Sequence, residues 1–390
     1  MAPGKGPMNI GALKDTVQDS NINFLIGSGL SMPFLRVLGN IEDLLSQVDS
    51  SDLADSKKKL IRAALYKRYC EEIVFKNVEI LKDDPASEEV LKNYKQFLKV
   101  INTILLSRKN SIINKQVNIF TTNIDIYFEK ALEELGLEYS DGFNGRFMPI
   151  FNLSNFRKST FQKSLHFDNT SEIPVFNLLK LHGSLTWEVC EVNGEKKIKF
   201  SPDLRIVSKL KANGYTEIVA AAPGQSLQDL TTATARKRLS PTTEEFLGSY
   251  QELPIINPTK EKFKLTLLNQ IHYELLRMYA NELEKENTVL FVLGFSFADE
   301  HIREITLRAA NSNPTLTVLI IAHSSKSKAD FEAKLDIAHI KNDNVKVIVP
   351  EQKPEEDGGG DKYEFDFANI NTEIFDCLLK MIEERNKPHV

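Results

Sequence analysis

Four short polar clusters hold the residues best suited to chemistry, and each directly follows an apolar run typical of a buried strand. Their amide, carboxylate, hydroxyl and imidazole groups, set beside glycines, can bind a nucleotide and move protons. Ligands of open parallel sheets bind at the carboxyl ends of the strands, so four such clusters on one edge predict a nucleotide site. The clusters are Gly27-Ser28-Gly29-Leu30-Ser31, Thr121-Thr122-Asn123-Ile124-Asp125, Leu181-His182-Gly183-Ser184 and Gly294-Phe295-Ser296-Phe297-Ala298-Asp299.

The first cluster combines two glycines with a turn after a strand. Gly27 and Gly29 allow the backbone to approach a pyrophosphate, and a following helix N-terminus would favour the anion. A plain strand-to-helix turn is an equally good interpretation of these residues alone. Met32 stands where the dehydrogenase fingerprint has its third glycine, and no strand ending in an acidic residue follows about 20 residues later. A hydride-transferring dehydrogenase is therefore disfavoured.

The second and third clusters offer groups for water and proton chemistry. Asn123 and Asp125 can bind a ribose or orient a water molecule, or either can cap the helix expected over Ile126–Glu134. His182 can act as a general base near neutral pH, although a single histidine is more often structural. Gly183 leaves room beside it, which favours the functional interpretation.

The fourth cluster has two interpretations as well. Ser296 and Asp299 have the spacing of a capping box, with Asp in place of Glu or Gln. Gly294 and Ser296 can instead approach a ribose or a phosphate.

Six apolar runs, several of them rich in β-branched residues, predict strands, and four of these precede the clusters. Helical patterns separate them, which predicts an α/β fold with a doubly wound, mostly parallel, Rossmann-like sheet. Apolar residues at helical spacing predict helices within Leu60–Tyr69, Val90–Leu105 and Phe263–Met278. The predicted strands are Ile22–Ile26, Val117–Thr121, Phe176–Leu181, Val289–Leu293, Leu316–Ile321 and Val345–Val349.

The remaining segments define the expected domain organisation. A core domain spans about residues 1–350, with a helical insertion at about 40–114. An irregular, proline-containing loop-and-helix excursion at about 184–260 is placed where it can lie over the ligand cleft. Residues 351–390 add the acidic, glycine-rich loop Pro354–Asp361 and a helix at Ile374–Glu384, a candidate assembly region.

Composition excludes several classes of protein. The 390 residues are 42% hydrophobic and 26% charged with a net charge of −5, which is typical of a soluble globular chain and gives no basic field for nucleic acid. Cys70, Cys190 and Cys377 are scattered and form no C-x-x-C pair, so a four-cysteine zinc site is excluded by count and no metal is expected. No membrane span or signal peptide is evident, so a cytoplasmic protein is expected.

The ordered clusters resemble the sirtuin family of NAD-consuming enzymes, whose Gly-Ala-Gly-x-Ser, Thr-x-Asn-x-Asp, Leu-His-Gly and Gly-x-Ser motifs here read GSGLS, TTNID, LHGS and GFSFAD. The resemblance implies that NAD is the ligand and that Asn123 and His182 are catalytic. Asn123 would hold the nicotinamide-side ribose or polarise water, and His182 would be the general base. Other residues implied to bind NAD are Gly27, Ser28, Gly29 and Ser31 at the phosphates, Arg36 with Pro33 and Phe34 beside the nicotinamide, Thr122, Asp125 at the nicotinamide amide, and Gly294 and Ser296 at the adenosine half.

The chain is most similar to the zinc-free bacterial sirtuin-like branch, given the missing cysteine module, the insertion and DGFNG at Asp141–Gly145. Members of that branch act in antiphage defence as NAD glycohydrolases, often with a HerA-type DNA-translocating ATPase. The resemblance implies such a partner and no zinc. Surplus apolar helix surface makes a homo-oligomer an added expectation, although core packing is the more common explanation for most of that surface. Gln225–Thr242 is a candidate cover for the site. A protein deacylase or ADP-ribosyltransferase, or a catalytically silent nucleotide-binding scaffold, stays as an alternative.

Overall fold

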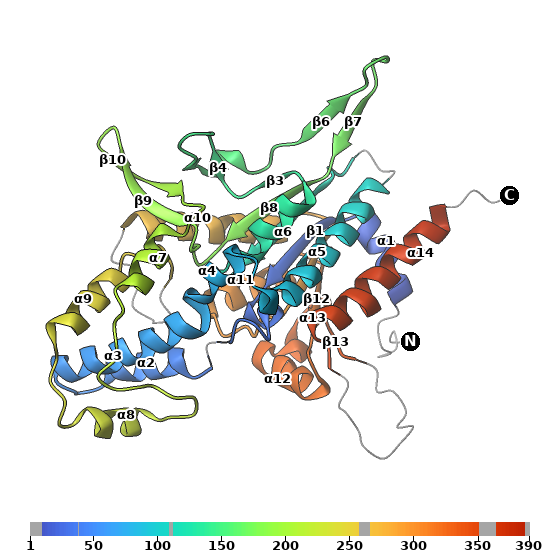
Figure 1. The fold of residues 1–390 in the computed structure, drawn as a ribbon. Helices are drawn as coiled ribbons and strands as arrows, with labels where there is room; N and C mark the ends of the chain where they lie inside the picture. Colours follow the sequence, from blue (N-terminus) through green and yellow to red (C-terminus); the bar gives the residue numbers. More distant parts are fainter. Residues whose placement is uncertain (1–9, 38, 109–111, 257–265, 351–363, 387–390) are drawn as a thin grey trace.

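The computed structural model describes residues 10–37, 39–108, 112–256, 266–350 and 364–386. In these ranges a seven-stranded parallel sheet forms the centre of the fold, in the order β13-β12-β11-β1-β2-β8-β3 (Figure 1). All six runs predicted as strands lie in it, so the doubly wound, Rossmann-like α/β fold is confirmed. The strands are β1 (Asn21–Ile26), β2 (Gln116–Thr121), β3 (Tyr139–Ser140), β8 (Val175–Lys180), β11 (Thr288–Leu293), β12 (Leu316–Ile321) and β13 (Val345–Ile348).

Helices cover both faces of this sheet, which explains why its strands are apolar without alternation. On one face, Phe24 of β1 meets Phe97 of α5 (Pro85–Leu106), with ring centroids 4.9 Å apart. On the other, Phe120 of β2 meets Tyr279 of α10 (Thr266–Leu283) at 5.0 Å. The first face also holds α1 (Ile10–Gln18), α6 (Tyr127–Leu135) and α14 (Asp376–Asn386), and the second holds α11 (Glu300–Ser312).

Between β1 and β2 the described part of the chain is mainly helical. Helix α5 packs against α6 on the sheet, whereas α2 and α3 pack against each other to one side (Figure 1). The segment consists of α2 (Ile41–Ser50), α3 (Asp55–Tyr69), a π-helical turn (Cys70–Val74), α4 (Lys76–Leu81) and α5.

The segment expected to be irregular contains an antiparallel hairpin instead. Strands β9 (Trp187–Val192) and β10 (Glu195–Phe200) join β4 (Phe143–Asn144) and β5 (Ile150–Phe151) in a second sheet of order β4-β5-β10-β9. Phe143, Phe151 and Trp187 pack as an aromatic cluster within it, which explains why these short strands are stable. The hairpin is followed by α7 (Arg205–Ala212), α8 (Leu227–Thr234) and α9 (Pro241–Tyr250).

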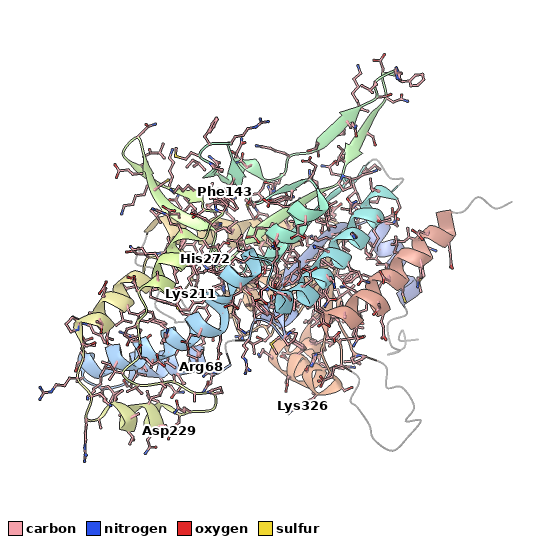
Figure 2. All side chains as sticks on the ribbon, in the orientation of Figure 1. Arg68, Phe143, Lys211, Asp229, His272 and Lys326 are labelled. Carbon is pink, nitrogen blue, oxygen red and sulfur yellow. The ribbon has the colours of Figure 1, made fainter. Side chains whose placement is uncertain are left out.

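Helix α8 does not form the expected cover. It packs against α2 and α3, and Lys57 of α3 donates hydrogen bonds to three carbonyl oxygens around the end of α8. Asp229, in α8, lies at the periphery, far from His272 of α10 (Figure 2). This part of Gln225–Thr242 is therefore bound to the helical insertion.

The remaining elements lie around the sheet. The β6–β7 hairpin projects from the body (Figure 1), and the predicted C-terminal helix is present as a π-helical turn (Asn371–Phe375) followed by α14. The acidic loop Pro354–Asp361 and Phe263 lie outside the described residues. No helix within the described ranges is long and apolar enough to cross a bilayer. The elements not yet given are β6 (Thr160–Lys163), β7 (Thr170–Ile173), α12 (Ser325–Leu335) and α13 (Phe367–Ile370).

Candidate functional site

The four polar clusters follow four neighbouring strands, β11, β1, β2 and β8, at the carboxyl edge of the sheet. Ile26 pairs with Leu293 on one side and with Thr121 on the other, and Thr121 pairs with Lys180. The clusters therefore begin at one level. The chain order runs outward in opposite directions from β1 and β11, so this pair is the topological switch point at which such sheets bind ligands.

The glycines at the switch point permit two loops to touch. A Cβ on Gly27 would lie 2.6 Å from Phe295 Cα, and one on Gly29 would lie 2.9 Å from Gly294 Cα. The amides of Gly27 and Gly29 donate to the carbonyl oxygens of Leu293 and Gly294, at 3.0 and 3.1 Å. Loop contact thus accounts for these glycines without a ligand. Ser28 and Gly29 are exposed and face solvent at this point.

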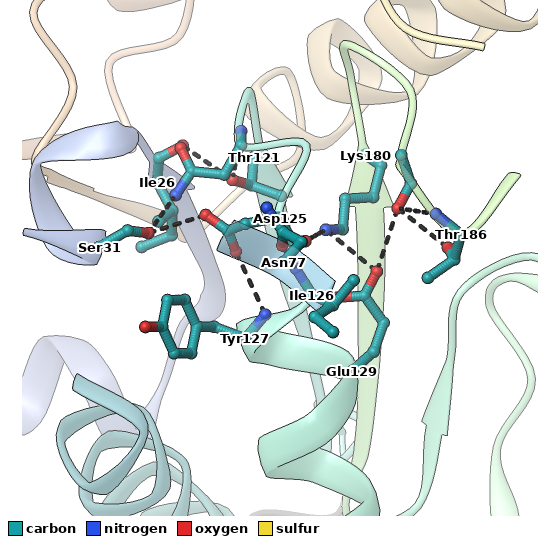
Figure 3. Close-up of polar contacts among 12 residues, drawn as sticks. Ile26, Ser31, Asn77, Thr121, Asp125, Ile126, Tyr127, Glu129, Lys180 and Thr186 are labelled. Atoms are coloured by element: carbon teal, nitrogen blue, oxygen red, sulfur yellow. Dashed lines mark hydrogen bonds and ion pairs between the residues drawn. The ribbon is translucent and has the colours of Figure 1, made fainter. Parts of the chain in front are cut away.

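A buried hydrogen-bond network joins the first cluster to the second (Figure 3). Ser31, at the end of the 3-10 turn Ser28–Ser31, donates to Asp125 Oδ2 at 2.8 Å and lies 2.9 Å from the Tyr94 hydroxyl. Asn123 Nδ2 donates to the Gly27 carbonyl at 3.2 Å and to Ser31 Oγ at 3.3 Å. The structure therefore brings Gly27, Ser31, Asn123 and Asp125 together, as expected from their positions after adjacent strands.

The carboxamide of Asn123 is only partly satisfied. Its side chain is buried, and among the described residues its Oδ1 has no hydrogen-bond partner. An orphaned buried acceptor is costly unless a ligand or water completes it, so Oδ1 is a position for a donor from outside the chain. Asp125 Oδ1 accepts from Tyr127 N at 3.2 Å, so the helix-start interpretation holds in part for Asp125 and not for Asn123.

His182 forms a pair with Asp299 that the sequence did not reveal. His182 Nε2 and Asp299 Oδ2 are 3.1 Å apart, and Asp299 Oδ1 accepts from Ile302 N at 3.0 Å. Burial raises the pKa of Asp299, but the hydrogen bond and charge of His182 outweigh it and bring the pKa to about 2. Asp299 is itself the N-cap of α11, so the predicted capping box led by Ser296 is wrong. Phe297, two residues before this N-cap, has a φ of +53°, so it lies outside the right-handed helix.

Helix α10 closes the space beside His182. The opening leaves about 10 Å³ for the centre of a water molecule and is lined mainly by apolar side chains such as Leu268 and Ile271. His272 of α10 faces the same opening; its ring lies 6.1 Å from that of His182, and its Nδ1 is 2.8 Å from the Leu181 carbonyl. Burial lowers the pKa of His272. Sequence reasoning missed His272, because only its position on the inner face of α10 brings it here.

The other predicted site residues lie nearer the surface. Arg36, Gly294 and Ser296 are exposed, and Thr122 is half-buried beside Asn123. Ser296 is joined to the body through its carbonyl, which accepts from Lys334 at 2.9 Å. In the described part of the chain, no hydrogen bond or ion pair links Arg36 to the Asn123 network or to His182.

The described residues contain no group of three or more His, Cys, Asp or Glu side chains placed to hold a metal ion. Cys70 is buried, and Cys190 and Cys377 are half-buried on other elements.

A parallel sheet with polar loops at its switch point, a buried amide acceptor and a histidine–aspartate pair define a nucleotide-binding α/β protein of the Rossmann-like class. The SIR2-like domain family matches residues 117–348, more than half of the chain, and the chain belongs to this family. Membership implies an NAD-using enzyme of the sirtuin superfamily. The matched region covers Asn123, His182 and Asp299, whereas the Gly27 turn precedes it. Comparison with curated proteins gives no match.

Proposed function

We propose that this protein is an NAD glycohydrolase, converting NAD and water into nicotinamide and ADP-ribose. The observation that carries the proposal is the placement of Asn123 and His182 on the adjacent strand ends of β2 and β8, with Asp299 reaching His182 from the loop after β11, in a SIR2-like domain. Breaking the nicotinamide–ribose bond develops positive charge on the sugar, so the site must stabilise charge and move a proton.

Asn123 suits the task of orienting the reacting ribose or a water molecule. Its amide nitrogen is held by Gly27 and Ser31, so the direction of the carboxamide is fixed and Oδ1 is left as an acceptor. A preorganised acceptor needs no reorientation during the reaction. The exposed Ser28, Gly294 and Ser296 surround the switch point, where we place the phosphates and the adenosine half.

His182 suits the task of general base. Because the Asp299 carboxylate only accepts hydrogen bonds, Nε2 carries the proton and Nδ1 keeps the lone pair. Asp299 thus fixes one tautomer and stabilises the charge that the ring gains when Nδ1 takes a proton from a ribose hydroxyl or from water.

The opening beside His182 favours water as the acceptor. A space of about 10 Å³ for the centre of a water molecule is enough for one water. We rank hydrolysis above a protein deacylase or ADP-ribosyltransferase because the three scattered cysteines cannot build the four-cysteine zinc module of the deacylase sirtuins. A catalytically silent scaffold is disfavoured by the proton-transfer pair His182–Asp299, which a binding role alone does not require.

For the biological role, we propose NAD depletion in bacterial antiphage defence, in complex with a HerA-type DNA-translocating ATPase and as a homo-oligomer. This part rests on the resemblance of the GSGLS, TTNID, LHGS and GFSFAD set to the zinc-free bacterial branch. NAD is the substrate in this proposal, and zinc has no part in it.

The test is release of nicotinamide and ADP-ribose from NAD by the purified chain, alone and with a HerA-type ATPase, in the absence of acyl peptide. We expect turnover that His182→Ala and Asn123→Ala abolish and that the matched control His323→Ala retains. His323 lies in the loop after β12, which β11, β1 and β2 separate from β8 in the sheet, and its ring contacts the Phe365 carbonyl. Turnover that requires an acylated peptide would establish the deacylase, and NAD binding without any turnover would establish the scaffold.

A further inference from the structure

A buried lysine–glutamate pair lies between the loop that carries Asn123 and the loop that carries His182. Lys180 ends β8, Glu129 lies in the first turn of α6, and Lys180 Nζ is 3.0 Å from Glu129 Oε1. The two side chains are only 3% and 7% exposed. Burial raises the pKa of Glu129, against the attraction of Lys180. Because desolvation offsets the attraction in such pairs, stability alone is a poor reason for one here.

The pair binds both loops at once (Figure 3). Lys180 Nζ also donates to the main-chain carbonyl of Asp125, two residues after Asn123. Ser184 Oγ, two residues after His182, donates to Glu129 Oε1 at 3.3 Å. Each of the two proposed catalytic residues is therefore flanked by a residue bound to this pair.

Main-chain hydrogen bonds also join the two loops, but they do not involve Asn123 or His182 themselves. Leu181 N donates to the Thr121 carbonyl at 2.8 Å, and Leu185 N donates to the Ile124 carbonyl at 3.1 Å. These two bonds join the loops on either side of the catalytic residues. The side-chain pair adds bonds at the point where the loops turn away from the sheet.

We propose that Lys180 and Glu129 are positioning residues that hold Asn123 and His182 in the arrangement needed for the chemical step. The proposal rests on the proposed NAD hydrolysis and deepens it. Through Asp125, whose carboxylate accepts from Ser31, the same set of contacts reaches the turn after β1. Three strand ends of the site are thus joined by one buried polar chain.

The decisive variant is Lys180→Met/Glu129→Met, which removes both charges and keeps the side-chain volume. Replacing a buried ion pair by apolar side chains is often neutral for stability, so we expect a melting temperature close to that of the wild type. We expect kcat to fall on the order of 100-fold, the scale of a misplacement of about 1 Å, with little change in KM. A folded double variant with wild-type kcat would overturn the proposal.

A milder pair of variants covers the case in which the double variant does not fold. Ser184→Ala removes one bond to Glu129, and we expect kcat to fall several-fold at an unchanged melting temperature. Ser87→Ala is the matched control, since Ser87 is also buried and donates a hydrogen bond at 2.8 Å to the carbonyl of Asp84, the N-cap of α5. Glu129→Gln keeps the acceptor and should retain most of the rate. Equal rates for the Ser184 and Ser87 variants would contradict the proposal.

Amide hydrogen exchange separates this proposal from the proposed function. If the wild type turns over no NAD, the function fails, yet the coupling of the loops remains measurable. We expect the paired substitution, or Ser184→Ala where the double variant does not fold, to speed exchange in both 121–126 and 181–186. Unchanged exchange in both segments would show that the pair does not hold the loops, whether or not the chain hydrolyses NAD.

Discussion

The substitution Asp299→Asn tests the histidine–aspartate pair most directly. The two carboxylate oxygens of Asp299 have separate tasks, because Oδ1 accepts from Ile302 N and Oδ2 accepts from His182 Nε2. Asparagine offers one oxygen and one NH₂ group, so it cannot serve both donors. If the oxygen keeps the helix cap, the NH₂ group faces the histidine and demands the lone pair of Nε2. His182 must then carry its proton on Nδ1 and loses its base atom.

The size of the effect follows from this competition. A positioned general base contributes about 10²- to 10⁴-fold to a rate, and inverting the tautomer forfeits that contribution. We therefore expect kcat to fall at least about 100-fold with KM nearly unchanged, since Asp299 does not bind the substrate. If the amide turns the other way, the cap is lost instead, at a cost of about 1 kcal/mol of stability. The variant must lose either rate or stability.

The assay measures nicotinamide release against NAD concentration together with thermal unfolding. Asp366→Asn is the matched control, because Asp366 also caps a helix through the amide three residues ahead, at 2.8 Å from Asn369 N, and has no contact with His182. We expect the control to keep its rate. An Asp299→Asn protein with both wild-type kcat and wild-type melting temperature would refute the argument, because no placement of an amide satisfies both donors.

Four further predictions follow from the fold and the site. Gly27→Ala should lower the melting temperature by several degrees, because the added Cβ would clash with the backbone of the Gly294 loop. Gly248→Ala in α9 is the control: its Cβ would have no neighbouring atom within 4 Å, so it should be neutral or stabilising by about 0.5–1 kcal/mol. Because the pKa of Asp299 in the folded protein is lowered to about 2, its ionised form should add about 2 kcal/mol to the free energy of unfolding. This contribution is present above pH 4 and is lost as the pH falls toward 2. Acid unfolding should detect it in the wild type and not in Asp299→Asn. Lys57→Met removes the hydrogen bonds that hold the end of α8, so we expect faster amide exchange in α8 and unchanged NAD turnover. A higher basal turnover would instead support α8 as a cover of the site. EDTA should leave turnover and melting unchanged, because the proposed hydrolysis uses Asn123, His182 and water and gives zinc no part; loss of either would reveal a metal site.

The strands could be predicted from sequence because burial on two faces leaves a local mark. Every residue of β11 is buried, and a run such as Val289–Leu293 suits few other environments. The shared edge of the four clusters followed from that, since parallel strands end on one side. The β9–β10 hairpin was missed although the sequence indicates it. Asn193 and Gly194, with φ of +53° and +80°, form a two-residue turn of the kind that favours hairpins, and the strands on either side partly alternate apolar and polar residues.

Contacts between distant segments could not be predicted in the same way. His182 and Asp299 are 117 positions apart, and no spacing rule relates them. The sequence instead favoured a local capping box for Asp299, because a cap needs only residues three apart. His272 carries no motif, and only the path of α10 across the end of β8 places it beside His182. Local patterns thus identify what can bind a nucleotide, whereas the pairing of groups that move protons depends on tertiary structure.

The contacts also bear on which of the predicted site residues the fold already accounts for. Gly27 and Gly29 are explained by the approach of the Gly294 loop, so a nucleotide is not needed to account for them. The buried Oδ1 of Asn123 lacks a donor from the described chain, as do those of Asn177, Asn344 and Asn371, but of these four only Asn123 follows a strand at the carboxyl edge where His182 lies. His182 is half-buried and is joined to an ionised aspartate that also caps α11. Asn123, His182 and Asp299 follow β2, β8 and β11, and they lie within the part of the chain that matches the SIR2-like family.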